Sequence, residues 1–335
     1  MMSCEIQNKK WPVELKHELD KYIVGQNKYK ETIAMSIYRH VKSGYVAPVL
    51  IKGPTGSGKT FLFQCLKKSK LLPANYTCMM TNVSRLTEEG IKGPDIEDIF
   101  VEYKSLCQNE KNMLYRGIIY IDEIDKIISS SVVNTAEGSI DRNATIQHQL
   151  MQILDGGKMA GVPTDNILFV FGGAFYKLDE MGEKKTGHRA VGFGKSAENE
   201  CVVKTDTIRE RMIELGFQRE FLGRIGQIVE LEELSKNELL TILMHPTRGL
   251  LSKIQKEYEA DGIKIYFEPE AIDLIIESVV REKLGARSVR NIVEKLLSGA
   301  WYHCIDGEYD KIVINRDSVL TGKINYKKQR TVDIA

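Results

Sequence analysis

The sequence lacks the features that mark disulfide-bonded, zinc-binding and membrane-spanning proteins. Its 335 residues hold six scattered cysteines, with no C-x-x-C pair and no histidines at metal-ligand spacing. Structural disulfides and structural zinc are therefore not expected. No apolar run approaches the length of a bilayer-crossing helix, and charged residues precede the first apolar stretch. We expect a cytoplasmic protein that makes no use of a membrane.

An excess of charge of one sign is also missing, because 47 Lys and Arg face 46 Asp and Glu, a formal net charge of +1. This balance gives no electrostatic argument for nucleic acid as the main partner. Apolar residues make up 42% and charged residues 28%, as in ordinary soluble globular proteins. The chain is too long for one hydrophobic core, so we expect two domains.

Over the first two-thirds of the chain, short apolar runs alternate with segments of helical periodicity. Strands are expected at residues 49–51, 76–83, 117–121 and 167–171, and helices at 12–21, 27–42, 59–68 and 96–106. In the first helix we expect Val13, Leu15 and Leu19 to contact the core. The alternation predicts an α/β domain with a parallel sheet covered on both faces.

The composition changes near residue 231, where Leu231–Leu234 leads into Ser235–Glu238, the capping box of a new helix. We place the domain boundary here, with a large domain over 1–232 and a small C-terminal domain over 233–335. The small domain is expected to be α+β and mostly helical. Its expected elements are a helix to about Tyr258, a strand at 263–267, helices at 269–281 and 286–297, and a last strand at 311–314.

A complete P-loop pattern lies between an expected strand and an expected helix. It consists of Gly53, Pro54, Thr55, Gly56, Ser57, Gly58, Lys59 and Thr60. The glycines let backbone N–H groups turn inward around phosphates, at the positive end of the following helix. We expect Lys59 to contact the β and γ phosphates of ATP and the Thr60 hydroxyl to bind Mg²⁺. A chance glycine-rich turn is the alternative, and the strand and helix on either side disfavour it.

Two acids, Asp122 and Glu123, follow the apolar run at 117–121. In a parallel sheet this position lies beside the phosphate loop, so Asp122 is expected to hold Mg²⁺ and Glu123 to polarise the attacking water. A solvated acidic pair at a strand end is the alternative. A small-molecule kinase would use the same loop, but it would not need the motifs that follow.

Six motifs, in this order, resemble those of the AAA+ protein-unfolding ATPases of the Clp/HslU type, and among these the ClpX family. They are Tyr22–Gln26, the P-loop, Ile121–Lys126, Gly172–Phe175, Gly216–Arg224 and Leu284–Arg287, and the similarity runs from about residue 12 to about residue 325. The resemblance implies an AAA+ P-loop large domain with a parallel sheet, followed by a small domain. It also implies ATP hydrolysis that is coupled to protein unfolding.

The resemblance assigns roles to four residues outside the P-loop. Ile23 and Val24 match the residues that pack on adenine, although plain core residues would look the same. Arg224 matches the arginine finger that one subunit inserts toward the γ phosphate of its neighbour, and a surface ion pair is the alternative. Arg287 matches the sensor arginine that the small domain offers to the same ATP. A finger supplied in trans implies a homo-oligomeric ring, expected to be a hexamer.

The segment Gly90–Gly93 matches the pore loop that grips unfolded polypeptide in this family. Ile91 and Lys92 stand where the family has an aromatic and an aliphatic residue, so this loop is expected to grip less firmly or not to pull at all. The polar segment 129–145 is either a second pore loop or a solvated connection. The segment 156–163 keeps only Lys158 of a basic cluster that the family has here.

Val191, Gly192 and Phe193 resemble the tripeptide by which ClpX docks onto a ClpP-like peptidase, and a Phe193 folded onto the core is the alternative. The zinc-binding domain that precedes the ATPase core in this family has no counterpart in the sequence. We therefore expect a ring-shaped unfoldase that delivers protein substrates to a ClpP-like peptidase. A remodelling or assembly factor that acts without a peptidase is the alternative, and a nucleic-acid-processing ATPase is disfavoured by the charge balance.

Overall fold

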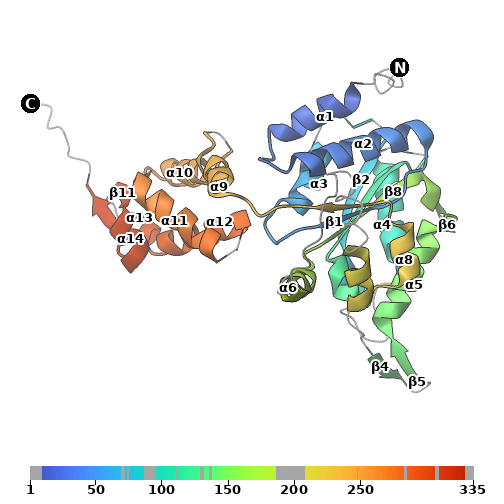
Figure 1. Cartoon of the computed structure of the whole chain (residues 1–335). Helices are drawn as coiled ribbons and strands as arrows, with labels where there is room; N and C mark the ends of the chain where they lie inside the picture. Colours follow the sequence, from blue (N-terminus) through green and yellow to red (C-terminus); the bar gives the residue numbers. More distant parts are fainter. Residues whose placement is uncertain are drawn as a thin grey trace, which may run out of the picture. The chain divides into compact units, whose positions relative to one another are not determined.

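The computed structural model folds as two compact units, one over residues 1–54 and 58–231 and the other over residues 55–57 and 232–335 (Figure 1). We propose that they are the large and small domains expected from the sequence. Within the described ranges, no helix has both the length and the apolar character that crossing a bilayer requires. The structure describes residues 10–68, 72–73, 75–86, 96–110, 112, 114–128, 132–135, 138–185, 208–246, 248–282, 285–305 and 309–328.

A five-stranded sheet with the order β2-β3-β8-β1-β9 forms the centre of the first unit. Each neighbouring pair of its strands is parallel, which confirms the predicted α/β fold. Only β8 lies between β1 and β3, and all three strands run in the same direction. The strand before the phosphate loop, β1, and the strand that ends in Asp122, β3, therefore end at the same edge of the sheet. The strands are β1 Val49–Lys52, β2 Thr77–Asn82, β3 Gly117–Asp122, β8 Ile167–Gly173 and β9 Gln227–Glu230.

Helices cover both faces of this sheet (Figure 1). Val49 and Ile51 of β1 pack toward α1, α2 and α3, whereas Leu50 packs toward α4, α5 and α8, as the period of a strand requires. The helices are α1 Trp11–Asp20, α2 Asn27–Ser43, α3 Lys59–Lys68, α4 Ile96–Asn109, α5 Arg142–Leu154, α6 Tyr176–Lys185, one over residues 208–215 and α8 Arg219–Arg224, with 3₁₀ turns η1 Val83–Leu86, η2 Ile124–Ile127 and η3 Thr164–Asn166.

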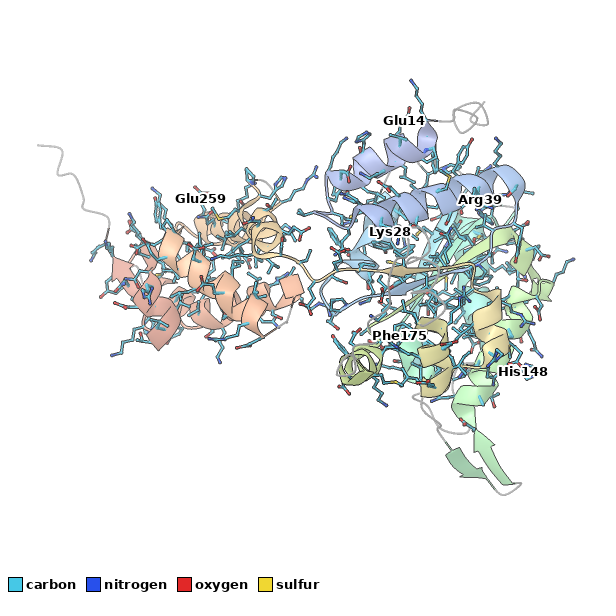
Figure 2. All side chains as sticks on the ribbon, in the orientation of Figure 1. Glu14, Lys28, Arg39, His148, Phe175 and Glu259 are labelled. Carbon is cyan, nitrogen blue, oxygen red and sulfur yellow. The ribbon has the colours of Figure 1, made fainter. Side chains whose placement is uncertain are left out.

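Helix α1 corrects one expected core contact. Leu15 and Leu19 are buried as predicted, but Val13 is 55% exposed, and Trp11 is buried instead. The helix begins at Trp11, so residues 11, 15 and 19 follow each other at four-residue spacing along one face. Val13 lies near the opposite face, beside Glu14, whose side chain extends from α1 in Figure 2.

Two connections in the first unit carry hairpins. In the polar segment 129–145, β4 Val132–Thr135 pairs antiparallel with β5 Gly138–Asp141, and α5 follows at once. The Asp141 carboxylate caps α5 by accepting the N–H groups of Asn143 and Ala144. The choice between a second pore loop and a solvated connection stays a prediction. In the segment 156–163, β6 Lys158–Met159 pairs antiparallel with β7 Val162–Pro163.

The second unit packs helices against a three-stranded sheet, β10-β11-β12. The capping box of Ser235 and Glu238 is confirmed. Two expectations were wrong: the helix to Tyr258 is two helices, and the strand at 311–314 is followed by another that pairs with it. The elements are α9 Lys236–Met244, α10 Leu250–Ala260, β10 Lys264–Phe267, α11 Pro269–Arg281, α12 Gly285–Leu297, α13 Ala300–Ile305, β11 Lys311–Ile314, α14 Arg316–Thr321 and β12 Asn325–Lys327.

The break between α9 and α10 has a local cause. His245 precedes Pro246, and a residue before proline is disfavoured in the helical region by contact with the proline ring. The backbone of His245 is accordingly extended, with ψ 126°, and it ends α9. The apolar periodicity on both sides of the break concealed it in the sequence.

Helix α2 buries His40 completely, with its Nδ1 atom 2.8 Å from the Tyr76 hydroxyl oxygen. The preceding side chain, Arg39, points outward in Figure 2. Burial, with a smaller contribution from the charge of Arg116, lowers the pKa of His40 from 6.5 to about 4. The folded chain therefore keeps this histidine neutral at pH values where an unfolded one takes up a proton.

We expect this histidine to make folding pH-dependent. Its contribution is fully present above pH 6.5 and is lost as the pH falls toward about 4. At about 1.4 kcal/mol per pH unit, lowering the pH from 6.5 to 5 should remove about 2 kcal/mol from the free energy of unfolding. His40→Gln keeps an acceptor for Tyr76, and its urea-unfolding free energy should vary less over this range. His17→Gln, at an exposed site on α1, is the control. An unchanged slope in His40→Gln would contradict the prediction.

Candidate nucleotide site

The phosphate loop connects β1 to α3, as the sequence predicts. Gly56 and Gly58 adopt left-handed φ angles of 81° and 99°, a conformation that other residues rarely take. A Cβ at Gly58 would meet no atom within 4 Å, so backbone conformation alone requires glycine there. The Lys59 ammonium group donates hydrogen bonds to the carbonyl oxygens of Gly53 and Pro54, which places it over the loop. The geometry suits a chain of phosphates at the first turn of α3.

Thr60 and Asp122 come together although they lie on different elements. The Thr60 hydroxyl, in the first turn of α3, donates to the Asp122 carboxylate at the end of β3, with an O–O distance of 2.5 Å. Mg²⁺ prefers oxygen ligands and takes few of them from protein, leaving positions for phosphate and water. These two oxygens fit such an ion. An Mg²⁺ ion held there would neutralise charge on the transferred phosphoryl group.

Glu123 has an unusual backbone for a residue other than glycine, with φ 59° and ψ 32°. Its carboxylate accepts a hydrogen bond from the Ser84 hydroxyl at 2.8 Å and pairs with Lys126 at 2.6 Å. Burial raises the pKa of Glu123, but hydrogen bonds from Lys126 and Ser84 outweigh it and hold the pKa below 4.5. The side chain is thus an ionised acceptor beside Asp122, which suits a group that orients water.

The last acid of the 121–126 motif, Asp125, links it to the end of β8. Its carboxylate oxygens accept the backbone N–H groups of Ala174 and Phe175, at 3.3 and 3.2 Å. A Cβ at Gly173 would lie 2.7 Å from one of these oxygens, which explains the need for glycine. Phe175 is buried within the first unit (Figure 2). Asp125 therefore holds the strand end beside the phosphate loop, a role that the sequence did not reveal.

The two residues predicted to contact adenine differ in their surroundings. Ile23 is 5% exposed and packs in the core between α1, α2 and the sheet, as the core alternative requires. Val24 is half-buried. Both lie in the turn between α1 and α2, where Gly25 and Gln26 take left-handed φ angles of 66° and 54°. Val24 is the residue of the two that is better placed to meet a base.

The side chain of Arg224 makes an ion pair within its own chain. Its Nε and Nη2 atoms donate to the two Asp155 oxygens, both at 2.6 Å, and its Nη1 atom donates to the Glu220 carbonyl. The side-chain hydrogen bonds between Arg224 and Asp155 lower the pKa of Asp155 and raise that of Arg224. The ion-pair alternative thus describes the observed contacts. A role as a finger stays a prediction.

Helix α8, which carries Arg224, is attached to the segment after Glu123 by one buried side chain. The Gln147 amide donates to the carbonyl oxygens of Ile127 and Gly216 and accepts the N–H of Gln218. The sequence reasoning missed Gln147. No helix was expected over residues 142–154, and the partners of Gln147 lie up to 71 residues away.

Other predicted site residues fall outside the first unit or outside the described ranges. Arg287 is exposed in the first turn of α12 in the second unit, so its role stays a prediction. Ile91 and Lys92 lie in 87–95, and Val191, Gly192 and Phe193 lie in 186–207, both outside the described residues.

Comparison with known proteins shows which family the chain belongs to. Residues 45–228 match the family model of the AAA domain (Cdc48 subfamily), and residues 234–302 match that of the C-terminal, D2-small domain of ClpB protein. The ATP-dependent Clp protease ATP-binding subunit ClpX of Treponema denticola is 31% identical, covering 92% of this chain and 81% of its own. The chain belongs to the ClpX family of AAA+ ATPases. The ClpX subunits of Borrelia duttonii and Borrelia recurrentis are each 30% identical, covering 93% of this chain and 79% of theirs.

Membership of the ClpX family makes the chain a nucleotide-binding ATPase. The P-loop and the acidic strand end both lie within the matched AAA segment, and the second unit begins close to where the small-domain match starts. The resemblance drawn from the six motifs is confirmed at this level. The roles of single site residues remain proposals.

Proposed function

We propose that this ClpX-family ATPase works in the cytoplasm as a homo-oligomeric ring, a hexamer, that unfolds protein substrates and delivers them to a ClpP-like peptidase. The observation that carries the proposal is the similarity to ClpX subunits over both units, together with the contact between Thr60 and Asp122 beside Glu123. In the proposed site, Lys59 binds phosphate, Thr60 and Asp122 hold Mg²⁺, and Glu123 orients the water.

Contacts between subunits complete this site in the proposal. Arg224 of one subunit acts on the ATP of its neighbour, and Arg287 of the small domain contacts the same nucleotide. Ring closure then lets hydrolysis move the loop that contains Ile91 and Lys92. Docking of a peptidase falls to Val191, Gly192 and Phe193, since an apolar anchor of this kind serves a partner's pocket.

We expect ATP-dependent loss of fluorescence from a tagged, folded fluorescent protein, with degradation only when a ClpP-type peptidase is added. Unfolding exposes the chromophore to water, so fluorescence reports the motor and peptide release reports the coupling. Active hydrolysis without any unfolding would overturn the motor proposal.

Deleting Val191–Phe193 is the matched variant in this assay. It should abolish peptidase binding, measured by co-sedimentation with ATP, and keep ATP hydrolysis and unfolding. A second candidate function, remodelling without a peptidase, is favoured by the Ile91 and Lys92 departures from the family's pore loop. If a peptidase does not stimulate unfolding and the deletion does not change it, the result supports remodelling without a peptidase.

A further inference from the structure

Helix α2 brings two consecutive buried polar side chains to the nucleotide site. The Tyr29 hydroxyl, on a residue that is 1% exposed, donates to the backbone carbonyl of Lys59 at 2.9 Å. The Lys30 ammonium group, on a residue that is 2% exposed, donates to the backbone carbonyl of Ile23 at 3.1 Å. Lys28, one residue before them, is exposed (Figure 2). One helix turn thus holds both the phosphate loop and the Ile23 turn.

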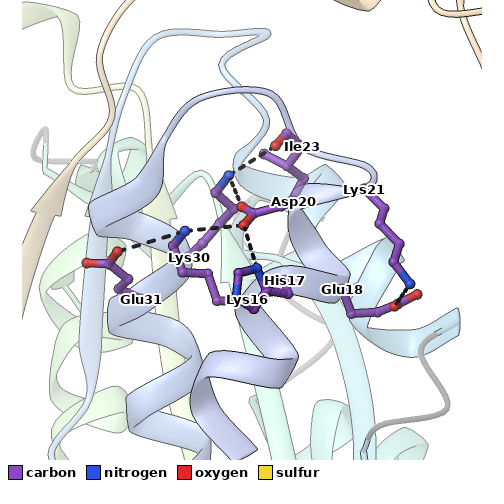
Figure 3. Close-up of polar contacts among 8 residues, drawn as sticks. All are labelled: Lys16, His17, Glu18, Asp20, Lys21, Ile23, Lys30 and Glu31. Carbon is purple, nitrogen blue, oxygen red and sulfur yellow. Dashed lines mark hydrogen bonds and ion pairs between the residues drawn. The ribbon is translucent and has the colours of Figure 1, made fainter. Parts of the chain in front are cut away.

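The buried charge of Lys30 is matched by Asp20 (Figure 3). One Asp20 oxygen lies 2.5 Å from the Lys30 ammonium, and the other lies 3.2 Å from that of Lys16. Burial raises the pKa of Asp20, but hydrogen bonds from Lys30 and Lys16 outweigh it and lower the pKa. The ion pair and the Ile23 carbonyl together compensate for removing the ammonium from water.

The backbone held by Lys30 needs external support. The turn after Ile23 contains two successive left-handed residues, Gly25 and Gln26, and Gln26 lacks the conformational freedom of glycine. A buried lysine is rare, and an apolar side chain would fill the space without desolvating a charge. Holding the Ile23 carbonyl in place is a task that an apolar side chain cannot perform.

We propose that Tyr29 and Lys30 are a positioning pair that fixes the spacing between the base-binding turn and the phosphate loop, so that Lys30 determines selectivity for adenine. This inference rests on the proposed contact of Ile23 and Val24 with the base. Tyr29 acts on the phosphate side through Lys59, and Lys30 acts on the base side through Ile23. The two side chains therefore have separable effects on nucleotide binding.

Lys30→Met should weaken ATP binding about tenfold, which corresponds to the loss of one well-placed interaction. The affinity for GTP should fall much less, and inorganic triphosphate, which lacks a base, should bind as before. Displacement of a fluorescent nucleotide by each of the three ligands measures this. In steady-state hydrolysis, KM for ATP should rise while kcat changes less than about twofold, as expected when binding alone is lost. General damage to the fold would weaken all three ligands together.

Lys16→Met is the matched control, since it removes the same charge from the same Asp20 carboxylate but touches no carbonyl of the turn. The affinities of Lys16→Met for ATP, GTP and triphosphate should equal those of the unaltered chain. Tyr29→Phe should show the opposite pattern to Lys30→Met, with triphosphate and ATP weakened to the same degree. If Lys30→Met does not fold, Lys30→Arg keeps the charge beside Asp20 and moves the donor away from Ile23, and a smaller loss of selectivity is expected.

Val24→Asp separates this inference from the site on which it rests. If Val24→Asp leaves the ATP to GTP affinity ratio unchanged, the turn does not bind the base, and the proposed adenine site is wrong. If Val24→Asp lowers the ratio but Lys30→Met does not, the adenine site stands and the positioning role of Lys30 is overturned.

Discussion

Glu123→Gln should reduce ATP hydrolysis by about 100-fold or more while ATP still binds with its normal affinity. The amide is similar in shape to the carboxylate, so the loop that holds the phosphates is unaffected. It cannot accept a proton from water or orient it by charge, and losses of this size are typical when a general base is removed. Steady-state hydrolysis and equilibrium binding of a fluorescent ATP analogue measure the two effects separately.

Two controls define this result. Glu102→Gln makes the same chemical change on α4, where the carboxylate pairs with Arg85 at an exposed position, and it should hydrolyse ATP normally. Lys59→Met removes the charge over the phosphate loop and should lose ATP binding itself. Normal turnover by Glu123→Gln would show that another group orients the water.

Arg224→Ala should also lower hydrolysis by about 100-fold or more, because an arginine finger stabilises the charge on the transferred phosphoryl group. ATP affinity should change little, since the rest of the site belongs to one subunit. The same substitution would matter much less if Arg224 served only its ion pair with Asp155, because surface pairs contribute about 1 kcal/mol or less.

Asp155→Ala distinguishes these two roles. It removes the ion pair but keeps the guanidinium, so it should retain most of the hydrolysis that Arg224→Ala loses. If both variants lose hydrolysis and melting temperature equally, the ion pair is structural and the finger assignment is wrong.

Mixing variants tests whether Arg224 acts between subunits. Arg224→Ala subunits have an intact hydrolytic site, and Glu123→Gln subunits have an intact arginine. Mixed rings should therefore hydrolyse ATP faster than either variant alone, because each Glu123→Gln neighbour supplies the missing arginine. No recovery in any mixture would place the action of Arg224 within its own subunit.

Local patterns predicted much of the fold. The α/β alternation, the strand and helix around the phosphate loop, and the Ser235 capping box each depend on residues close together in the chain. The errors arose where a local pattern had two interpretations. Apolar spacing continued across the break at Pro246, and Val13 is apolar although its position two residues before Leu15 places it near the opposite face of the helix.

The sequence by itself determined the phosphate site, because a P-loop needs only eight neighbouring residues between a strand and a helix. It could not determine which side chains hold that site in place. Lys30 with Ile23, Asp125 with Phe175, and Arg224 with Asp155 are pairs formed by packing. A hydrogen bond requires its two atoms to be about 3 Å apart. Only the meeting of helices and strand ends around one sheet fixes positions that closely.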